Sequence, residues 1–222
     1  MAAIQLIDLW KSYDGTSYVL KGIDLVIDQG DFVSIRGRSG AGKSTLLRIM
    51  GLLDRPTRGR VLIQGRDVTE LSDAEQSSLR LKHIGFVFQF FNLLPHLTVM
   101  ENIELPMAMA GVSKSERRER ALELLKTFGL EHLADRLPRE LSGGEQQRVA
   151  VIRTLANRPR IILADEPTGH LDDENAELLM GLFKEINEKY GVTIVITSTS
   201  LRGELPTKTD YLLKGGRLHR VG

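Results

Sequence analysis

Gly37-Arg38-Ser39-Gly40-Ala41-Gly42-Lys43-Ser44-Thr45 matches the pattern G-x-x-x-x-G-K-[ST], a glycine-rich loop whose backbone amides wrap around phosphate groups. Residues 31–35 before this loop, which include Phe32, Val33 and Ile35, predict a strand. The residues after it predict a helix, because Leu46, Leu47, Ile49 and Met50 follow helical spacing up to Gly51. A strand, a glycine loop and a helix in this order are the context that the pattern requires, which disfavours a chance match.

Two residues of this loop carry predicted chemistry of their own. Lys43 is expected to reach the β- and γ-phosphates of a nucleotide, and the Ser44 hydroxyl is expected to bind Mg²⁺. The helix that begins near Lys43 adds the positive end of its dipole to the same site. Kinases and GTPases also use such a loop, so the loop alone predicts nucleotide binding without identifying the protein.

The composition narrows the class of protein. The 222 residues are 41% apolar and 27% charged, which is typical of a soluble globular protein, and the net charge of +1 argues against nucleic acid as a partner. The absence of cysteine excludes disulfides and thiol chemistry. The first ten residues do not resemble a signal peptide, and no apolar run approaches the roughly 18 residues that span a bilayer. We therefore expect any membrane connection to run through a partner.

Alternating strand and helix patterns predict an α/β fold with a mostly parallel sheet. Residues 1–88 and 158–222 are expected to form the core, with an antiparallel lobe near the N-terminus, and residues 89–157 a helical insertion. Ser113 and Glu116 fit a capping box at the start of a helix that ends near Gly129, and Gly215-Gly216 predicts a hairpin. Further predicted strands are residues 4–9, 20–27, 60–64, 84–88, 161–164 and 192–197, and a long amphipathic helix is predicted at residues 173–190.

Two acids follow the strand Ile161-Ile162-Leu163-Ala164. Asp165 is expected to hold Mg²⁺ through water as the second anchor of the phosphate site. Glu166 is expected to act as the general base that polarises the attacking water. The alternative, a solvated pair of acids at a strand end, is disfavoured by the presence of the glycine loop.

A second glycine turn occurs in Leu141-Ser142-Gly143-Gly144-Glu145-Gln146-Gln147-Arg148, directly before a helical pattern. Its hydroxyl, its amides and the helix N-terminus are suited to a second anion site. A chain with two such sites can pair with a second copy, so that each serine-glycine turn closes on the other copy's γ-phosphate. A serine-capped helix with no ligand explains the same residues equally well.

This octapeptide resembles the signature motif of ATP-binding-cassette ATPases, and the other motifs occur in the order typical of that family over nearly the whole chain. The resemblance implies the P-loop NTPase fold of these ATPases, with Mg·ATP held between two copies by Gly37 to Thr45, Asp165, Ser142, Gly143 and Gly144. It identifies Gln89 as the glutamine that links Mg²⁺ and the attacking water to the membrane partner, and Tyr13 as the aromatic that stacks on adenine. Taken alone, Tyr13 is more typical of a packed strand aromatic. Gly169-His170-Leu171-Asp172 resembles the loop that crosses to the partner copy.

Two stretches are similar to the lipoprotein-release and macrolide-export (LolD and MacB) subclass of this family. They are Ile84-Gly85-Phe86-Val87-Phe88-Gln89-Phe90-Phe91-Asn92-Leu93-Leu94-Pro95 and Ala164-Asp165-Glu166-Pro167-Thr168-Gly169. Members of this subclass work as dimers beneath a permease pair at the cytoplasmic face of the membrane. The resemblance therefore implies a peripheral membrane ATPase with a separate permease, with no information on its cargo.

One position departs from the family pattern. Ser198 stands where the family has a histidine that contacts the γ-phosphate, and Thr199 stands where an acid is usual. Serine donates one hydrogen bond from a shorter side chain and is never cationic. We expect this change to slow hydrolysis more than nucleotide binding, because phosphoryl transfer depends on positioning and electrostatics. His170 is a weaker candidate for a substitute.

The segment from residue 90 to residue 109 is strongly apolar. Most of its side chains are expected in a helical core, and a subset at residues 90–97 is expected to face a coupling helix of the permease. An alternative function is a non-transport ATPase that signals through a membrane partner. A soluble cassette acting on DNA or ribosomes is disfavoured by the neutral charge.

Overall fold

The computed structural model describes residues 1–199 and 205–221, and its centre is a six-stranded sheet in the order β10-β9-β3-β8-β7-β6. The pairings β3–β8, β3–β9, β7–β8 and β6–β7 are parallel, and only the edge pair β9–β10 is antiparallel. The predicted mostly parallel sheet is therefore confirmed. The strands are β3 (Phe32–Arg36), β6 (Ile84–Val87), β7 (Ile161–Ala164), β8 (Thr193–Ser198), β9 (Thr209–Lys214) and β10 (Arg217–Arg220).

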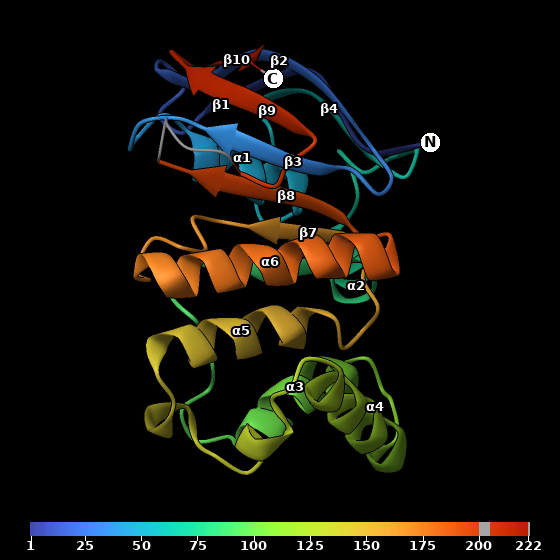
Figure 1. Cartoon of the computed structure of the whole chain (residues 1–222). Helices are drawn as coiled ribbons and strands as arrows, with labels where there is room; N and C mark the ends of the chain where they lie inside the picture. The colour runs from blue at the N-terminus through green and yellow to red at the C-terminus, as the bar shows by residue number, and fades with distance from the viewer. Residues whose placement is uncertain (200–204, 222) are drawn as a thin grey trace.

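A second sheet covers one side of this centre and is antiparallel, as predicted for the N-terminal lobe. Helix α1 (Lys43–Met50) lies between the two sheets, and its apolar side chains pack against both of them in one core cluster (Figure 1). The strands run in the order β2-β1-β4-β5 and comprise β1 (Ala2–Ser12), β2 (Tyr18–Asp28), β4 (Arg58–Ile63) and β5 (Arg66–Asp67).

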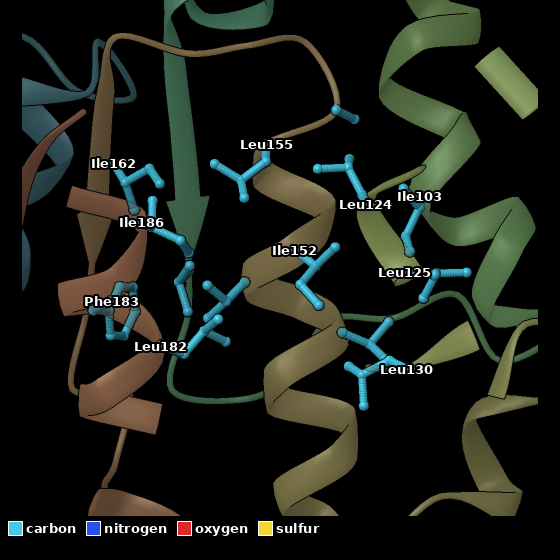
Figure 2. Packing of buried hydrophobic residues seen from close by; sticks show 14 of the residues in the cluster. Ile103, Leu124, Leu125, Leu130, Ile152, Leu155, Ile162, Leu182, Phe183 and Ile186 are labelled. Atoms are coloured by element: carbon cyan, nitrogen blue, oxygen red, sulfur yellow. The ribbon is translucent and has the colours of Figure 1, made fainter. Parts of the chain in front are cut away.

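The other face of the parallel sheet is covered by α6 (Asp173–Tyr190) and, beside it, by α5 (Gly143–Thr154), which packs against β6: a Cβ on Gly85 would lie 2.7 Å from Thr154 Cβ. Figure 2 shows Ile152 of α5 between Leu182 and Phe183 of α6 on one side and Leu125 and Leu130 on the other. Full burial of each such side chain contributes about 1.5–3 kcal/mol. The position of the α5 N-terminus is therefore set by a packed core on two sides of the helix.

The remaining helices are α2 (Asp73–His83), α3 (Val99–Met109) and α4 (Lys114–Thr127), with short 3₁₀ turns at Glu131–Leu133 and Pro138–Glu140. Each of α2, α3, α4 and α5 begins with a serine or threonine whose hydroxyl accepts from the amide of a glutamate three residues later. The predicted capping box at Ser113 is thus confirmed, and Gly129 adopts the predicted left-handed conformation after α4 (φ 68°).

The structure differs from the sequence-based expectation in two segments. Helical structure does not start at Gln89, because the chain from Gln89 to Thr98 is irregular and α3 begins only at Val99. Asn92 has a left-handed backbone (φ 50°), which an α-helix excludes. Helix α2 was not expected, and Gln76 is its only buried residue. Among the described residues, no helix has the length and apolar character needed to span a bilayer.

Candidate functional site

The predicted site residues gather where three neighbouring parallel strands end. The loop after β3 carries the glycine motif, Asp165 and Glu166 follow β7, and Ser198 is the last residue of β8. Arg36 at the end of β3 pairs with Ser198 at the end of β8. The glycine loop therefore begins directly beside the last residue of β8. In Figure 1 the arrowheads of β3, β7 and β8 all point to the left side of the view. In an open α/β sheet, ligands bind at this carboxyl edge.

The glycine loop is fixed by close contacts at its two ends. A Cβ on Gly37 would lie 2.8 Å from the Leu213 carbonyl oxygen, and a Cβ on Gly42 would lie 2.9 Å from a Val19 methyl carbon. Gly42 also has φ 101°, which favours glycine. The loop therefore runs close to β2 and β9 and turns directly into α1. Arg38, Ser39, Gly40 and Ser44 are exposed, Ala41, Gly42 and Thr45 are half-buried, and Gly37 and Lys43 are buried.

Lys43 points back into its own loop and toward the acids after β7. Its Nζ donates to the carbonyl oxygens of Gly37 (3.0 Å) and Arg38 (3.2 Å), and it lies 3.1 Å from Glu166 Oε1. The Lys43 side chain is only 3% exposed. A buried ammonium with one carboxylate partner is suited to a polyanionic ligand, because a phosphate oxygen can replace the carboxylate.

Thr197 joins the two acids. Its hydroxyl donates to Asp165 Oδ1 (2.6 Å) and accepts from the Glu166 amide (3.0 Å). Glu166 has a left-handed backbone (φ 45°), a conformation of higher energy for a residue with a side chain. The Thr199 hydroxyl lies 3.4 Å from Glu166 Oε2, and the Ser198 carbonyl accepts from the Gly37 amide at 3.1 Å. The end of β8 thus contacts both the acids and the glycine loop.

Gln89 lies beside the loop that follows Glu166. Its Nε2 is 3.1 Å from the position that a Cβ would take on Gly169. One residue further along each segment, the rings of Phe90 and His170 lie 4.8 Å apart between centroids. The structure therefore brings Gln89 to the same edge of the sheet as Glu166.

Tyr13 stands next to α1 and is 61% exposed. Its hydroxyl donates to Asp54 Oδ2 (2.8 Å) and approaches Thr45 Oγ1 (3.4 Å), and Lys11 Nζ lies 4.7 Å from the ring centroid. Burial opposes ionisation of Asp54, but hydrogen bonds from Lys11 and Tyr13 outweigh it and lower its pKa. An anionic Asp54 thus holds an exposed aromatic ring against the glycine loop.

Ser142 caps α5 and is exposed, as is Gly143, whereas Gly144 is buried against Asn175. The Ser142 hydroxyl donates to Glu145 Oε2 (2.9 Å) and accepts from the Glu145 amide (3.3 Å). The backbone hydrogen bond from Ser142 is the main cause of a lowered Glu145 pKa. This turn lies on the left side of Figure 1, as the strand ends do, but at the start of α5, which packs on the opposite face of the sheet from α1.

The predicted residues thus form two separate groups. Within residues 1–199 and 205–221, no hydrogen bond or ion pair joins Ser142, Gly143 or Gly144 to the glycine loop. The sequence reasoning missed Thr197 and Gln147, whose side chains connect the loops of the first group. Both stand inside stretches that the motifs already drew attention to, but their contacts lie far away in the sequence.

Comparisons with known proteins agree with this arrangement. The model of the family described as ABC transporter matches residues 20–169. The chain is 52% identical over 213 residues to the lipoprotein-releasing system ATP-binding protein LolD of Bacteroides thetaiotaomicron, covering 96% of this chain and 97% of the relative. It is 50% identical over 201 residues to an uncharacterized ABC transporter ATP-binding protein of Thermotoga maritima, covering 89% and 86% of the two chains.

A similar solved structure is that of the ATP-binding cassette MJ0796 of Methanocaldococcus jannaschii, a dimer in a post-hydrolysis state bound to ADP and Pi. It has a TM-score of 0.87 and 46% identity, with 98% of this chain and 97% of that chain covered. The matched family model spans more than half of the chain and the relatives span nearly all of it. The chain therefore belongs to the ABC transporter family, as one of its LolD-like ATP-binding subunits with ATPase activity.

Proposed function

We propose that two copies of this chain bind two Mg·ATP molecules head to tail and hydrolyse them to drive a separate membrane permease. The observation that carries the proposal is the separation of the two predicted phosphate sites. The exposed Ser142–Gly143 turn stands on the same side of Figure 1 as the strand ends, but it begins α5, which packs on the face of the sheet opposite to α1. A second copy, rotated head to tail, can place its own turn over the phosphates that this loop holds. The dimeric MJ0796 structure supports this arrangement.

In this proposal, ATP lies along the loop from Gly37 to Thr45. The amides of the loop and of the first turn of α1 face the phosphates, and Lys43 exchanges the Glu166 carboxylate for phosphate oxygens. Tyr13 stacks its exposed ring on adenine. The ring is held in place by the Lys11 ammonium, which lies over it, and by Asp54, which accepts a hydrogen bond from its hydroxyl. Both residues that orient Tyr13 belong to the chain that holds the phosphates.

The proposed Mg²⁺ ligands are the side-chain oxygen atoms of Ser44, Asp165 and Gln89. Mg²⁺ prefers oxygen ligands. Among the described residues, no group of three or more histidines, cysteines or acids is arranged to hold a metal ion, and this fits a cation that takes most of its ligands from phosphates and water. When bound, Mg²⁺ neutralises charge on the phosphate oxygens. Thr197 orients the Asp165 carboxylate toward the site by donating to its Oδ1.

Hydrolysis requires one proton transfer that this chain can perform. The Glu166 carboxylate accepts a proton from water, the water oxygen forms a bond to the γ-phosphorus, and the bond to ADP breaks. Thr199 holds the second carboxylate oxygen of Glu166. Ser198 offers a short hydroxyl where a longer imidazole would reach the γ-phosphate, so we propose that hydrolysis is slow while binding is retained.

The proposed permease contact is the segment after Gln89. Phe90 is 66% exposed and Leu94 is 44% exposed, whereas Val99, Ile103 and Met107 further along are buried core residues. Exposed apolar side chains directly after a site glutamine are suited to a partner helix. The proposed location is therefore the cytoplasmic face of the membrane, where the protein would be bound through the permease. An ATPase that signals through a membrane partner would use the same surface, and only the partner's identity separates the two.

Light scattering on the purified Glu166→Gln variant tests the dimer. We expect a dimer with Mg·ATP and a monomer without it, and a monomer under both conditions would contradict the proposal.

Co-purification with the tagged permease tests the membrane contact, with Phe90→Asp and Leu94→Asp expected to abolish it. Val26→Asp is the matched control, because Val26 is an exposed apolar residue (53%) on the antiparallel sheet. Equal capture of all variants would remove the 90–94 segment from the interface.

A further inference from the structure

Gln147 of α5 connects the two segments that carry Gln89 and Glu166. Its Nε2 donates to the carbonyl oxygen of Phe88 at 3.1 Å and to that of Pro167 at 2.9 Å. Phe88 immediately precedes Gln89, and Pro167 immediately follows Glu166. A single amide nitrogen therefore fixes the spacing between the segment of the predicted water-orienting glutamine and the segment of the predicted base.

The burial of Gln147 indicates that the role of its side-chain amide is to connect these two segments. The residue is 0% exposed, and in the part of the chain that the structure describes its Oε1 has no hydrogen-bond donor. A fully buried acceptor without a partner is unfavourable, and an apolar residue of the same length would avoid it. An amide has two N–H groups, and both are used here. The two donated hydrogen bonds thus offset the unfavourable free energy of the unpaired Oε1.

The bridged segments also contact each other outside Gln147. Gln89 Nε2 lies 3.1 Å from the position that a Cβ would take on Gly169, and the Phe90 and His170 ring centroids lie 4.8 Å apart. Two segments that are connected at three places move as a unit when one of them is displaced. The bridge belongs to α5, which is packed between α6 and the helices beyond it (Figure 2).

Helix α5 also carries Ser142 at its N-terminus. Ser142 and Gln147 are about 7 Å apart along the axis of one continuous helix, at about 1.5 Å per residue. A displacement of the exposed Ser142 turn is therefore passed on to the amide of Gln147, since a packed helix moves as a rigid element.

We propose that Gln147 is a positioning residue that links the Ser142 turn to Glu166 and Gln89 of the same chain. Closure of the turn on the partner copy's ATP then sets the geometry of this chain's own base, so that each ATP site is adjusted by occupancy of the other. This inference rests on the proposed head-to-tail dimer. It assigns Gln147 no contact with nucleotide, so its loss changes the hydrolysis rate and the cooperativity and leaves ATP affinity in place.

The test is the Gln147→Met variant of the full chain, which keeps the length of the side chain and removes both donors. Single-turnover hydrolysis of radiolabelled Mg·ATP is expected to slow about 10- to 100-fold, the effect of a displacement of about 1 Å at a reacting centre. The dissociation constant for ATP is expected to stay within about threefold, which corresponds to no lost contact with the ligand. The Hill coefficient of the steady-state rate against ATP concentration is expected to fall toward one.

Asn187→Leu is the matched control. The Asn187 amide nitrogen donates to the carbonyl oxygens of Gly30 and Val192, each at 2.8 Å, at the other end of the sheet. This control removes a comparable pair of side-chain-to-backbone bonds at a distant place, so it is expected to lower Tm with little change in hydrolysis or cooperativity. If Gln147→Met does not fold, Gln147→Asn replaces it, because a stem shorter by one methylene cannot reach both carbonyls.

The outcomes separate the inference from the proposed function. A wild-type chain that neither dimerises with Mg·ATP nor hydrolyses it overturns both. A wild-type chain that does both, with a Gln147 variant whose rate and Hill coefficient equal those of Asn187→Leu, overturns only the role of Gln147. A slower rate accompanied by an equally large loss of ATP affinity also overturns it, since that result places Gln147 in binding.

Discussion

Lys43 Nζ lies 3.1 Å from Glu166 Oε1, so the lysine of the glycine loop is paired with the acid that we propose as the base. The lysine side chain is 3% exposed and the glutamate side chain 20%. A buried lysine requires a counter-charge, and a γ-phosphate can supply it in place of Glu166. Nucleotide binding and release of the base for its reaction are thus coupled by a single exchange of partners.

Glu166→Gln is expected to separate these two effects. Single-turnover hydrolysis should fall about 10²- to 10⁴-fold, the usual contribution of a general base. ATP affinity should stay equal or increase, because the amide competes less well than the carboxylate for Lys43. Rapid-quench hydrolysis and equilibrium dialysis measure the two quantities. Glu177→Gln, an exposed change on α6, is the control, and a parallel loss of affinity in Glu166→Gln would contradict the exchange.

Ser198→His is expected to speed turnover. The Ser198 carbonyl accepts from the Gly37 amide, so position 198 stands beside the glycine loop, and an imidazole extends further into the site than a hydroxyl. One added donor to the γ-phosphate is worth up to about 10²–10³ in rate, and we expect at least about tenfold. Steady-state phosphate release compares the two proteins. Equal rates would show that the serine protein already hydrolyses ATP efficiently.

Tyr13 gives a test of adenine stacking that leaves the phosphates untouched. Tyr13→Ala should raise KM for ATP about 2- to 12-fold, because a lost aromatic stack costs about 0.5–1.5 kcal/mol. Tyr13→Phe keeps the ring and loses only the hydrogen bonds to Asp54 and Thr45, so its KM should change less than about twofold. A Phe variant as weak as the Ala variant would assign the binding energy to the hydroxyl instead.

The fold was predictable where the pattern was strong and local. The strands at the site and the helix at Asp173–Tyr190 follow from apolar periodicity, and α6 has the predicted bounds. Helix α2 begins with a serine-glutamate capping box, but Gln76 is its only buried residue, so it lacks an apolar stripe. Without such a stripe, the strongest sequence signal for a helix is missing.

The irregular segment at residues 89–98 shows the opposite case. Its apolar residues suggest a helix, yet the chain is held by Asn102 of α3, a fully buried residue. Asn102 accepts from the Leu94 amide and donates to the carbonyl oxygens of Leu94, Leu97 and Thr98. One buried side chain that satisfies four backbone groups overrides the local preference. Apolar spacing does not predict such a contact.

In the candidate site, too, local motifs could be predicted from the sequence and long-range contacts could not. The glycine loop, the two acids and the Ser142 turn are contiguous motifs, and each could be predicted from its own residues. The bridges that place these motifs join residues far apart in the sequence: Thr197 to Asp165, and Gln147 to Phe88. Periodicity and motifs describe single segments, so they predict which residues react but not which residues hold them in position.

Asp210 predicts a pH dependence of stability. Burial opposes its ionisation, but hydrogen bonds from Ser34 and Thr207 and the ion pair with Arg36 outweigh burial and lower its pKa below 3.8. A carboxyl group with a lowered pKa contributes stability above about pH 4, and this stability is lost as the pH falls through the folded-state pKa.

Asp210→Asn should therefore lower the free energy of unfolding at pH 7 by about 1.5–3 kcal/mol, and the difference from wild type should shrink below pH 4. Urea titrations at pH 7 and pH 3 measure it. Asp73→Asn is the control, because Asp73 also pairs with an arginine but its side chain is 96% exposed. A difference that is constant with pH would show that the charge of Asp210 is not the cause.

Glu145 predicts a charge effect on the ATP-dependent dimer. The Ser142 hydroxyl donates to Glu145 Oε2, so a phosphate that approaches Ser142 meets a carboxylate held there. The lowered Glu145 pKa keeps this carboxylate anionic at neutral pH. Glutamine preserves a capping box and carries no charge. Glu145→Gln should then form the Mg·ATP dimer at a roughly 30-fold lower protein concentration, since a unit charge about 4 Å away contributes about 1 kcal/mol in water and the dimer has two such sites.

The gain should decrease at high ionic strength, because salt screens exposed charges. Glu116→Gln is the matched control, since Glu116 forms the same capping box with Ser113 at the start of α4. Any effect of Glu116→Gln on dimerisation would indicate helix stability rather than charge. Sedimentation velocity at low and high salt measures the dimer dissociation constant of both variants. An unchanged dissociation constant of Glu145→Gln at low salt would contradict the prediction. It would mean that Ser142 exchanges the Glu145 carboxylate for phosphate without electrostatic cost.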